Sequence, residues 1–424
     1  MSFREKRSWM TARGTWKDRK GSGKPPLSST SPPPLGEILA TIQLEDLESG
    51  KTETDNYARI TNTQYLTSYN WINGNSPQIM VPGEPPAWTP LSKPVQLRGD
   101  SGLYYRDKNA ARYPLYPLEP MIRAIMMDKP EFSLESLDII GCGSTLGNLL
   151  HFARGQGRPF RMLIEVVGNT VFFIRRENSP TETIPDVRGY GHAFPEAYTT
   201  WSKSTRGSES HQRLITYDFA GMSCLVRFEA DGFLPNMIPD GLRTDPEHTA
   251  GTNDIDANDL LSSIEAVTVS TMLPITTATK STTLEISKGG CYIPQCAVFD
   301  LKTRSIKRSN VDTLSEELSR LWIRQVPNFV LAYHTFGNFN DIRVRDVRQE
   351  LMQWEHAQKP GLLRFATLLQ MVVSFARSVE DGKLEVEFEQ DSNILNLRSP
   401  GGVVGSVLPS SITDKWDLYH DSGA

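Results

Sequence analysis

The sequence predicts an α+β fold, with a mixed β-sheet core and flanking helices in a single large domain. Three observations favour this class: two β-hairpin patterns in the middle of the chain, a strand–helix–strand pattern after residue 296, and a long apolar helix near residue 370. At 424 residues the chain is long enough to bury a large core. A hydrophobic share of 38% and a net charge of −5 suit a globular protein and argue against a uniformly basic nucleic-acid coat.

Three segments are expected to lie outside that core. Residues 1–34 start with a basic run and become Ser- and Pro-rich, which predicts a disordered tail, with a mitochondrial presequence as the alternative. Residues 235–280 are polar and favour a disordered insertion. The single domain is therefore predicted at residues 35–410, and a flexible C-terminus at residues 411–424.

The first half of the domain is predicted to combine short helices with hairpins. Helical patterns cover residues 118–127 and 146–153, and a short strand is expected at residues 137–141. Residues 160–176 and 211–231 each alternate around a glycine-containing turn, as β-hairpins do. The middle of the chain should therefore be an antiparallel sheet.

A strand–helix–strand unit follows the predicted insertion. Strand patterns occupy residues 297–303 and 329–334, and between them Thr313 and Glu316 fit a capping box that opens a helix. This order predicts a right-handed crossover that joins a parallel pair of strands. Gln325 lies eleven residues beyond Leu314, a rotation of about 20° on a helix, so it is expected to face the sheet.

The last two elements are a buried helix and an edge-like strand. Residues 362–379 are apolar on nearly every side but contain two polar residues, which predicts a buried helix and not a membrane span. Residues 384–388 then alternate with Glu385, Glu387 and Glu389. We expect a half-exposed strand on which these three glutamates are solvated.

Two strands carry the candidate site. Side chains alternate along a strand, so Glu229 and Asp231 share one face, and Asp300 and Lys302 share a face of another strand. Carboxylates in this number could hold one or two Mg²⁺ or Mn²⁺ ions, while the lysine could stabilise charge on a phosphate. The alternative is an ordinary row of surface charges. The apolar neighbours of Asp300 argue instead for a strand covered on both faces.

Other motifs are weaker. Glu285 and Lys288 would point to opposite faces of a strand, and His192, His211 and His334 are scattered and are expected to be structural or exposed. No phosphate-cradling glycine loop exists, so no nucleotide cofactor is expected. Four cysteines without metal-ligand spacing, no signal peptide and no long apolar run predict a nuclear or cytoplasmic protein, neither secreted nor transmembrane.

The order of the motifs resembles that of the DXO-type decapping exoribonuclease family, which belongs to the PD-(D/E)xK nuclease-like superfamily. The resemblance spans roughly residues 95–395, at low identity. It rests on five segments: residues 137–140 with Leu146, residues 191–198, residues 228–231, residues 300–303 and residues 322–327. It implies a sheet core of the PD-(D/E)xK type.

The resemblance also implies a function: metal-dependent hydrolysis at RNA 5′ ends, by decapping, pyrophosphate hydrolysis or 5′-to-3′ exonuclease action. By position, Glu196, Glu229, Asp231 and Asp300 would hold two Mg²⁺ or Mn²⁺ ions. Asp300, Lys302 and Gln325 would carry catalysis, with the last two positioning the water and the scissile phosphate. The implied partners are capped, triphosphate or monophosphate RNA 5′ ends and an exoribonuclease protein.

Three departures from the family pattern bear on activity. Gly143 stands where the family has an arginine, so Arg161 or Arg188 is expected to supply a phosphate contact in its place, beside Gln325. Glu196 comes one residue late, and Asp300 replaces a glutamate. A catalytically degenerate protein that binds RNA or a nuclease partner is therefore the alternative function.

Overall fold

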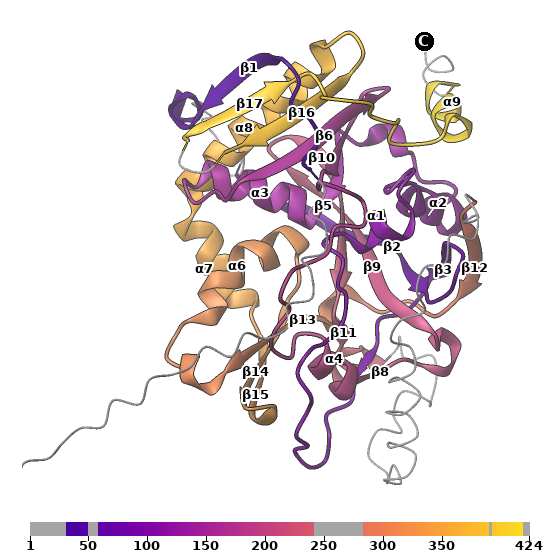
Figure 1. Ribbon diagram of the computed structural model, residues 1–424, viewed down its shortest axis with the longest axis vertical. Helices are drawn as coiled ribbons and strands as arrows, with labels where there is room; N and C mark the ends of the chain where they lie inside the picture. The colour runs from indigo at the N-terminus through magenta and orange to yellow at the C-terminus, as the bar shows by residue number, and fades with distance from the viewer. Residues whose placement is uncertain (1–30, 50–57, 241–282, 390–391, 419–424) are drawn as a thin grey trace, which may run out of the picture. The chain divides into compact units, whose positions relative to one another are not determined.

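Two β-sheets form the frame of the protein (Figure 1). The computed structural model describes residues 31–49, 58–240, 283–389 and 392–418, and every element below belongs to the unit Pro32–Ala424. Within the described residues, eleven strands build the larger sheet and six build the smaller one. Both sheets mix parallel and antiparallel pairs, which confirms the predicted α+β class.

The larger sheet brings together strands from the whole length of the unit. In spatial order its strands are β1 (Ile38–Gln43), β17 (Ile394–Arg398), β16 (Lys383–Phe388), β6 (Phe160–Val167), β7 (Thr170–Arg175), β5 (Ile139–Cys142), β10 (Met222–Ala230), β9 (Ser208–Phe219), β2 (Thr61–Ile72), β3 (Gln78–Pro82) and β12 (Glu285–Gly289).

The smaller sheet contains the predicted crossover unit. Its order is β15 (Asn338–Asp346), β14 (Asn328–Thr335), β13 (Val298–Ser305), β11 (Gly232–Phe233), β4 (Ala87–Trp88) and β8 (Thr199–Thr200). The helices are α1 (Lys108–Arg112), α2 (Glu119–Asp128), α3 (Gly143–Ala153), α4 (Ala193–Tyr198), α6 (Thr313–Arg324), α7 (Arg348–Ala357), α8 (Lys359–Ser378) and α9 (Ser410–Leu418).

Both hairpins form as predicted, and so does the parallel pair of strands joined through a helix. β6 and β7 join through Gly168, and β9 and β10 join through Ala220 and Gly221, all three at positive φ, as tight hairpin turns require. β13 and β14 run parallel, with α6 between them in the chain. The helices predicted at residues 118–127 and 362–379 correspond to α2 and α8.

The larger sheet is covered on both faces. Leu225 of β10 belongs to a core shared with α2 and α9, whereas the next residue, Val226, belongs to a core shared with α3, α6 and α8. Figure 1 shows α2 and α3 on either side of the strands between them. A third core lies on the smaller sheet, where Phe194 and Tyr198 of α4 pack with Phe299. The end of β10 therefore lies between helices on both sides.

The prediction for β16 is wrong about its outer face. Glu385 and Glu387 are buried, because β16 lies between β6 and β17 and arginine side chains from the neighbouring segments pack against these carboxylates. Glu385 forms ion pairs with Arg161 and Arg176, and Glu387 pairs with Arg398 at 2.6 Å. Buried carboxylates need such partners. Only Glu389 is exposed, as predicted.

The two ends of α6 also differ from prediction. Asp312, not Thr313, is the N-cap, and its side chain accepts a hydrogen bond from the backbone of Ser315. Gln325 follows the helix in a left-handed conformation, at φ 50°, so helical rotation does not set its direction. Its amide instead donates to the carbonyl of Trp322 at 2.6 Å.

The predicted segments outside the core are only partly described. Residues 1–30 of the expected tail and residues 241–282 of the expected insertion lie outside the described residues. The C-terminus was predicted to be flexible from residue 411, but residues 411–418 belong to α9, whose Trp416 packs on Phe172 with ring centres 5.5 Å apart; residues 419–424 lie outside the described residues. Among the described residues, no helix is both long and apolar enough to cross a membrane.

Candidate functional site

A pocket of about 460 Å³ lies at the carboxyl ends of β5 and β10, which run parallel. Its walls include the last residues of β10, the start of α3, and parts of α1, α4 and β9. In sheets with parallel strands, ligands commonly bind at the carboxyl ends, because the loops that follow the strands diverge there. The pocket is therefore the first candidate for a binding site.

The pocket wall is densely charged. It contains five acidic residues and five Arg or Lys residues, the acids being Asp107, Glu196, Glu209, Glu229 and Asp231, and the bases Arg106, Lys108, Arg175, Arg227 and Arg324. A purely structural cavity is usually apolar, whereas convergent charged groups mark binding sites.

Three of the predicted metal ligands meet in this pocket. Glu229 accepts a hydrogen bond from Lys108 at 2.9 Å, and this carboxylate raises the pKa of the lysine. Asp231 accepts from the backbone N–H of Leu301 at 2.6 Å. Burial, followed by the nearby charge of Asp300, raises the pKa of Asp231 to about 7. Burial also raises the pKa of Glu196, which comes from α4.

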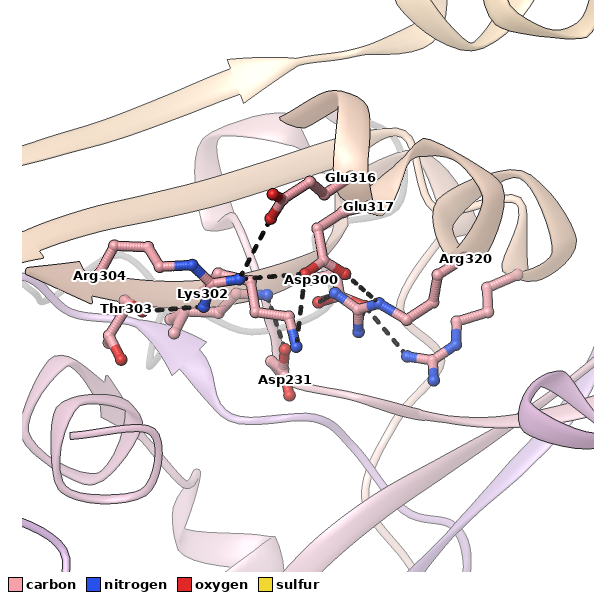
Figure 2. A network of polar contacts seen from close by, with 10 residues as sticks. Asp231, Asp300, Lys302, Thr303, Arg304, Glu316, Glu317 and Arg320 are labelled. Atoms are coloured by element: carbon pink, nitrogen blue, oxygen red, sulfur yellow. Dashed lines mark hydrogen bonds and ion pairs between the residues drawn. The ribbon is translucent and has the colours of Figure 1, made fainter. Parts of the chain in front are cut away.

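The fourth predicted ligand, Asp300, does not line the pocket. It lies on β13, is 2% exposed, and receives three hydrogen bonds from α6. Two come from Arg320 at 2.6 and 2.7 Å (Figure 2), and one comes from Arg324 at 3.1 Å. Burial alone would raise the pKa of Asp300, but the two guanidinium groups outweigh it and hold this pKa below its ordinary value. Lys302 shares that face of β13, as predicted, and its Nζ lies 3.8 Å from Glu317.

This arrangement does not fit the predicted metal site. No group of three or more His, Cys, Asp or Glu side chains in the described part of the chain is placed to hold a metal ion. The physical reason is that both carboxylate oxygens of Asp300 are engaged by guanidinium groups, and Glu229 is engaged by Lys108. A hard divalent cation would need those oxygens free.

The other predicted contacts lie outside the pocket wall. Gln325 accepts a hydrogen bond from Thr63 at 3.3 Å, and Arg161 is paired with Glu385 on β16. Arg188 lies exposed in a loop and is also absent from the pocket lining. The phosphate contacts expected from Arg161, Arg188 and Gln325 therefore do not form part of this pocket.

The sequence prediction missed two arginines that line the pocket, Arg227 and Arg324, and a third, Arg320, that lies behind its wall. Arg227 shares a strand face with Glu229, two residues away, so alternation alone could have identified it. Arg320 and Arg324 are four residues apart and thus on one face of α6, opposite β13. Only the structure shows that Arg324 fills the space beside Gly143, where an added Cβ would lie 3.2 Å from its Cγ and Nε.

The wall formed by β9 carries buried polar groups with unused hydrogen-bonding capacity. Asn70 Oδ1 accepts from the backbone of Glu84, so the 2.6 Å contact from His211 Nδ1 must be a donated hydrogen bond. Burial lowers the pKa of His211 well below its ordinary value, which leaves Nε2 as a neutral acceptor. Among the described residues, His211 Nε2, Gln212 Nε2 and Ser210 Oγ have no hydrogen-bond partner. Such atoms in a pocket wall favour a polar ligand.

Solved structures with a similar fold include Rai1 proteins of two yeasts. A mutant Rai1 of S. pombe in complex with 3′-FADP matches at TM-score 0.53 and 6% identity, over 85% of this chain and 98% of that one. Rai1 of Scheffersomyces stipitis matches at TM-score 0.53 and 10% identity, over 89% and 98%. Its complex with (3′-NADP)⁺ and a calcium ion matches at TM-score 0.52 and 10% identity, over 92% and 99%.

These matches show that the chain has a Rai1/DXO-like fold, as the motif order predicted. At such low identity they establish the fold alone. No curated protein matches the sequence. A family model described as "Domain of unknown function (DUF8563)" matches residues 46–398, which is most of the chain. The protein therefore belongs to this DUF8563 family, with a Rai1/DXO-like fold.

Proposed function

We propose that this protein recognises the 5′ end of an RNA chain in the pocket at the carboxyl ends of β5 and β10. The observation that carries the proposal is the pocket wall, where five Arg or Lys side chains and several unpaired buried polar atoms converge. The Rai1/DXO-like fold supports it, because the Rai1 structures named above hold the dinucleotides 3′-FADP and (3′-NADP)⁺.

The wall offers a group for each part of a nucleotide. Terminal phosphates could accept hydrogen bonds from Arg324 and from the first N–H groups of α3, at Gly143 and Ser144. Ribose hydroxyls could meet Gln212 and His211, whose unpaired atoms supply a donor and an acceptor. Trp201 also lines the pocket and could pack against a base.

A second candidate function is hydrolysis of that 5′ end with Mg²⁺ or Mn²⁺. One observation favours it: Glu196, Glu229 and Asp231 do line a single pocket, as the resemblance implied. The S. stipitis Rai1 complex contains a calcium ion, which supports a divalent cation in this candidate. This candidate assigns catalysis to Asp300, Lys302 and Gln325, as the resemblance implied, and it requires these side chains to turn toward the pocket, because none of them lines it. An exoribonuclease partner and a nuclear or cytoplasmic location stay predictions.

Binding is tested with one oligoribonucleotide carrying a 5′-hydroxyl, monophosphate, triphosphate or NAD cap, by fluorescence anisotropy at fixed salt. We expect the phosphorylated ends to bind more tightly than the hydroxyl end. Lys108→Ala should weaken this preference about tenfold, because it leaves the charge of Glu229 unpaired beside the phosphate, and a like-charge repulsion on the order of 1.4 kcal/mol is a tenfold change in affinity. Lys93→Ala is the matched control, since Lys93 is exposed and does not line the pocket.

Hydrolysis is tested on the same four RNAs with Mn²⁺ present, by following the 5′-terminal product. Release of product that is lost in Glu196→Gln would establish the second candidate. Equal affinity for hydroxyl and phosphorylated ends would overturn the proposal of 5′-end recognition.

A further inference from the structure

Asp300 lies at the centre of a network that joins β13 to α6. Arg320 binds both of its oxygens and is held in turn by Glu317, whose Oε2 lies 2.7 Å from Arg320 Nε (Figure 2). Arg304 and Lys302 of β13 approach the same glutamate at 3.5 and 3.8 Å. The direction of each of these side chains is therefore fixed by at least one charged neighbour.

The charges around this network are already balanced. Five carboxylates and six cations gather where β10, β13 and α6 meet, the acids being Glu229, Asp231, Asp300, Glu316 and Glu317, and the cations Lys108, Lys302, Arg304, Arg308, Arg320 and Arg324. A divalent cation is attracted by an excess of negative charge and by free oxygen lone pairs. This region has no such excess.

Arg324 connects the network to the pocket. Its Nη1 donates to Asp300, while its side chain lines the pocket and its Nε has no partner among the described residues. Gly143, the first residue of α3, leaves the space through which this side chain passes, because an added Cβ would lie 3.2 Å from two of its atoms. The guanidinium thus lies beside the N-terminus of an 11-residue helix, whose N–H groups also favour an anion.

We propose that Arg324, oriented by Asp300, is the anion-binding group of the pocket, and that Arg320 and Arg324 together stand where a divalent cation would otherwise lie. The pocket then binds a phosphate group directly and without metal. Asp300 is a positioning residue in this arrangement, not a metal ligand. The identity of the phosphate as an RNA 5′ end rests on the proposed function, whereas the metal-free character of the site does not.

The metal part is tested by calorimetric titration of Mn²⁺ into the full chain. We expect the wild-type protein to show no saturable heat at millimolar Mn²⁺. The double variant Arg320→Met and Arg324→Met frees the oxygens of Asp300 and should gain Mn²⁺ binding. Saturable binding to the wild type that is lost in Asp300→Asn would overturn the proposal.

The anion part is tested with a 5′-monophosphate oligoribonucleotide and with inorganic pyrophosphate, both in EDTA. Arg324→Gln should weaken the binding of both probes about tenfold to a hundredfold, the range expected for a lost charge-assisted hydrogen bond. Asp300 keeps its two bonds to Arg320 in this variant, so the fold should persist. Gly143→Ala is a second variant that displaces Arg324 without removing a charge, and it should weaken binding in the same direction.

Arg343→Gln is the matched control, because Arg343 pairs with Asp341 on the surface of β15 and does not line the pocket. Binding of pyrophosphate with no binding of RNA would reject the RNA proposal and leave Arg324 as an anion site. Binding of either probe that disappears in EDTA, or that survives Arg324→Gln unchanged, would overturn the inference.

Discussion

The carboxylates near the pocket differ in what neutralises each of them. Glu229 has a lysine and Asp300 has two arginines, whereas the hydrogen bond that Asp231 accepts within the described part of the chain comes from the backbone N–H of Leu301. Burial and the charge of Asp300 therefore raise the pKa of Asp231 to about 7, while the pKa of Asp300 stays low. Of Asp231 and Asp300, Asp231 is therefore the carboxyl group that binds a proton near neutral pH.

This assignment predicts a pH-dependent effect of Asp231→Asn on stability. The folded state keeps the Asp231 proton at pH values where the unfolded chain, with a pKa near about 3.9, has lost it. The free energy of unfolding of the wild type therefore falls as the pH rises toward 7. The Asp231→Asn variant has an uncharged amide at this position, so it does not lose this contribution. We expect Asp231→Asn to gain on the order of 1 to 2 kcal/mol relative to wild type between pH 5 and pH 8, since the side chain is only partly buried.

Urea unfolding at the two pH values measures this gain. Asp341→Asn is the control with no expected change, because Arg343 holds the pKa of the exposed Asp341 below its ordinary value and this carboxylate is ionised in the folded and the unfolded state at both pH values. An Asp231→Asn variant with the same relative stability at both pH values would show that Asp231 is not protonated at neutral pH.

Strand alternation predicted correctly which side chains reach the pocket, whereas helix rotation did not. Glu229 and Asp231 share a face and reach one pocket, as period-two alternation predicts. Gln325 misses the pocket because α6 ends one residue earlier, and Arg324 lines it instead. The end of a helix depends on tertiary contacts, so a sequence pattern fixes it only to within a residue or two.

At the scale of elements, β16 is a strand, as predicted, but its side chains are buried where the sequence pattern predicted a solvated face. Its alternation resembled an edge strand with one solvated face, but β6 and β17 flank it and both of its faces are covered. The sequence contains the partners of its glutamates, yet Arg161 and Arg176 are more than 200 residues away along the chain. Local patterns carry no information about such distant pairs.

This environment predicts a large effect of Glu385→Gln. Glu385 is fully buried between two arginines, so its loss of charge leaves both guanidinium groups without their counter-ion. Breaking a buried pair from one side costs about 3 to 5 kcal/mol. Guanidinium denaturation should show this loss, whereas Glu389→Gln, the exposed glutamate of the same series, should stay within about 0.5 kcal/mol of wild type. Equal small effects would place Glu385 in solvent, as its sequence pattern suggested.

At the scale of the whole molecule, the individual elements were more predictable than their assembly. Both hairpins, the crossover and the buried helix α8 follow from periodicity and turn residues. The order of eleven strands does not, because β1 pairs with β17 and β2 pairs with β9, strands that lie far later in the chain. Motif order recovered the Rai1/DXO-like fold because the sequence of segments persists where identity has fallen to 6–10%.

The shared sheet predicts that the two large cores unfold together. Adjacent residues of β10 pack into the cores on opposite faces of the sheet. Unfolding of one core would therefore expose the strand against which the other core packs. Leu225→Ala opens a cavity on the α2 face, and Leu369→Ala opens one on the α8 face, at a cost of about 2 to 5 kcal/mol each. We expect each variant to lower one common melting temperature, followed by far-UV circular dichroism for the backbone and by near-UV circular dichroism for the packed aromatic side chains, which include Trp71 in one core and Trp322 in the other. If Leu225→Ala produced two separated transitions, the faces would be independent folding units, and the pocket between them could open without global unfolding.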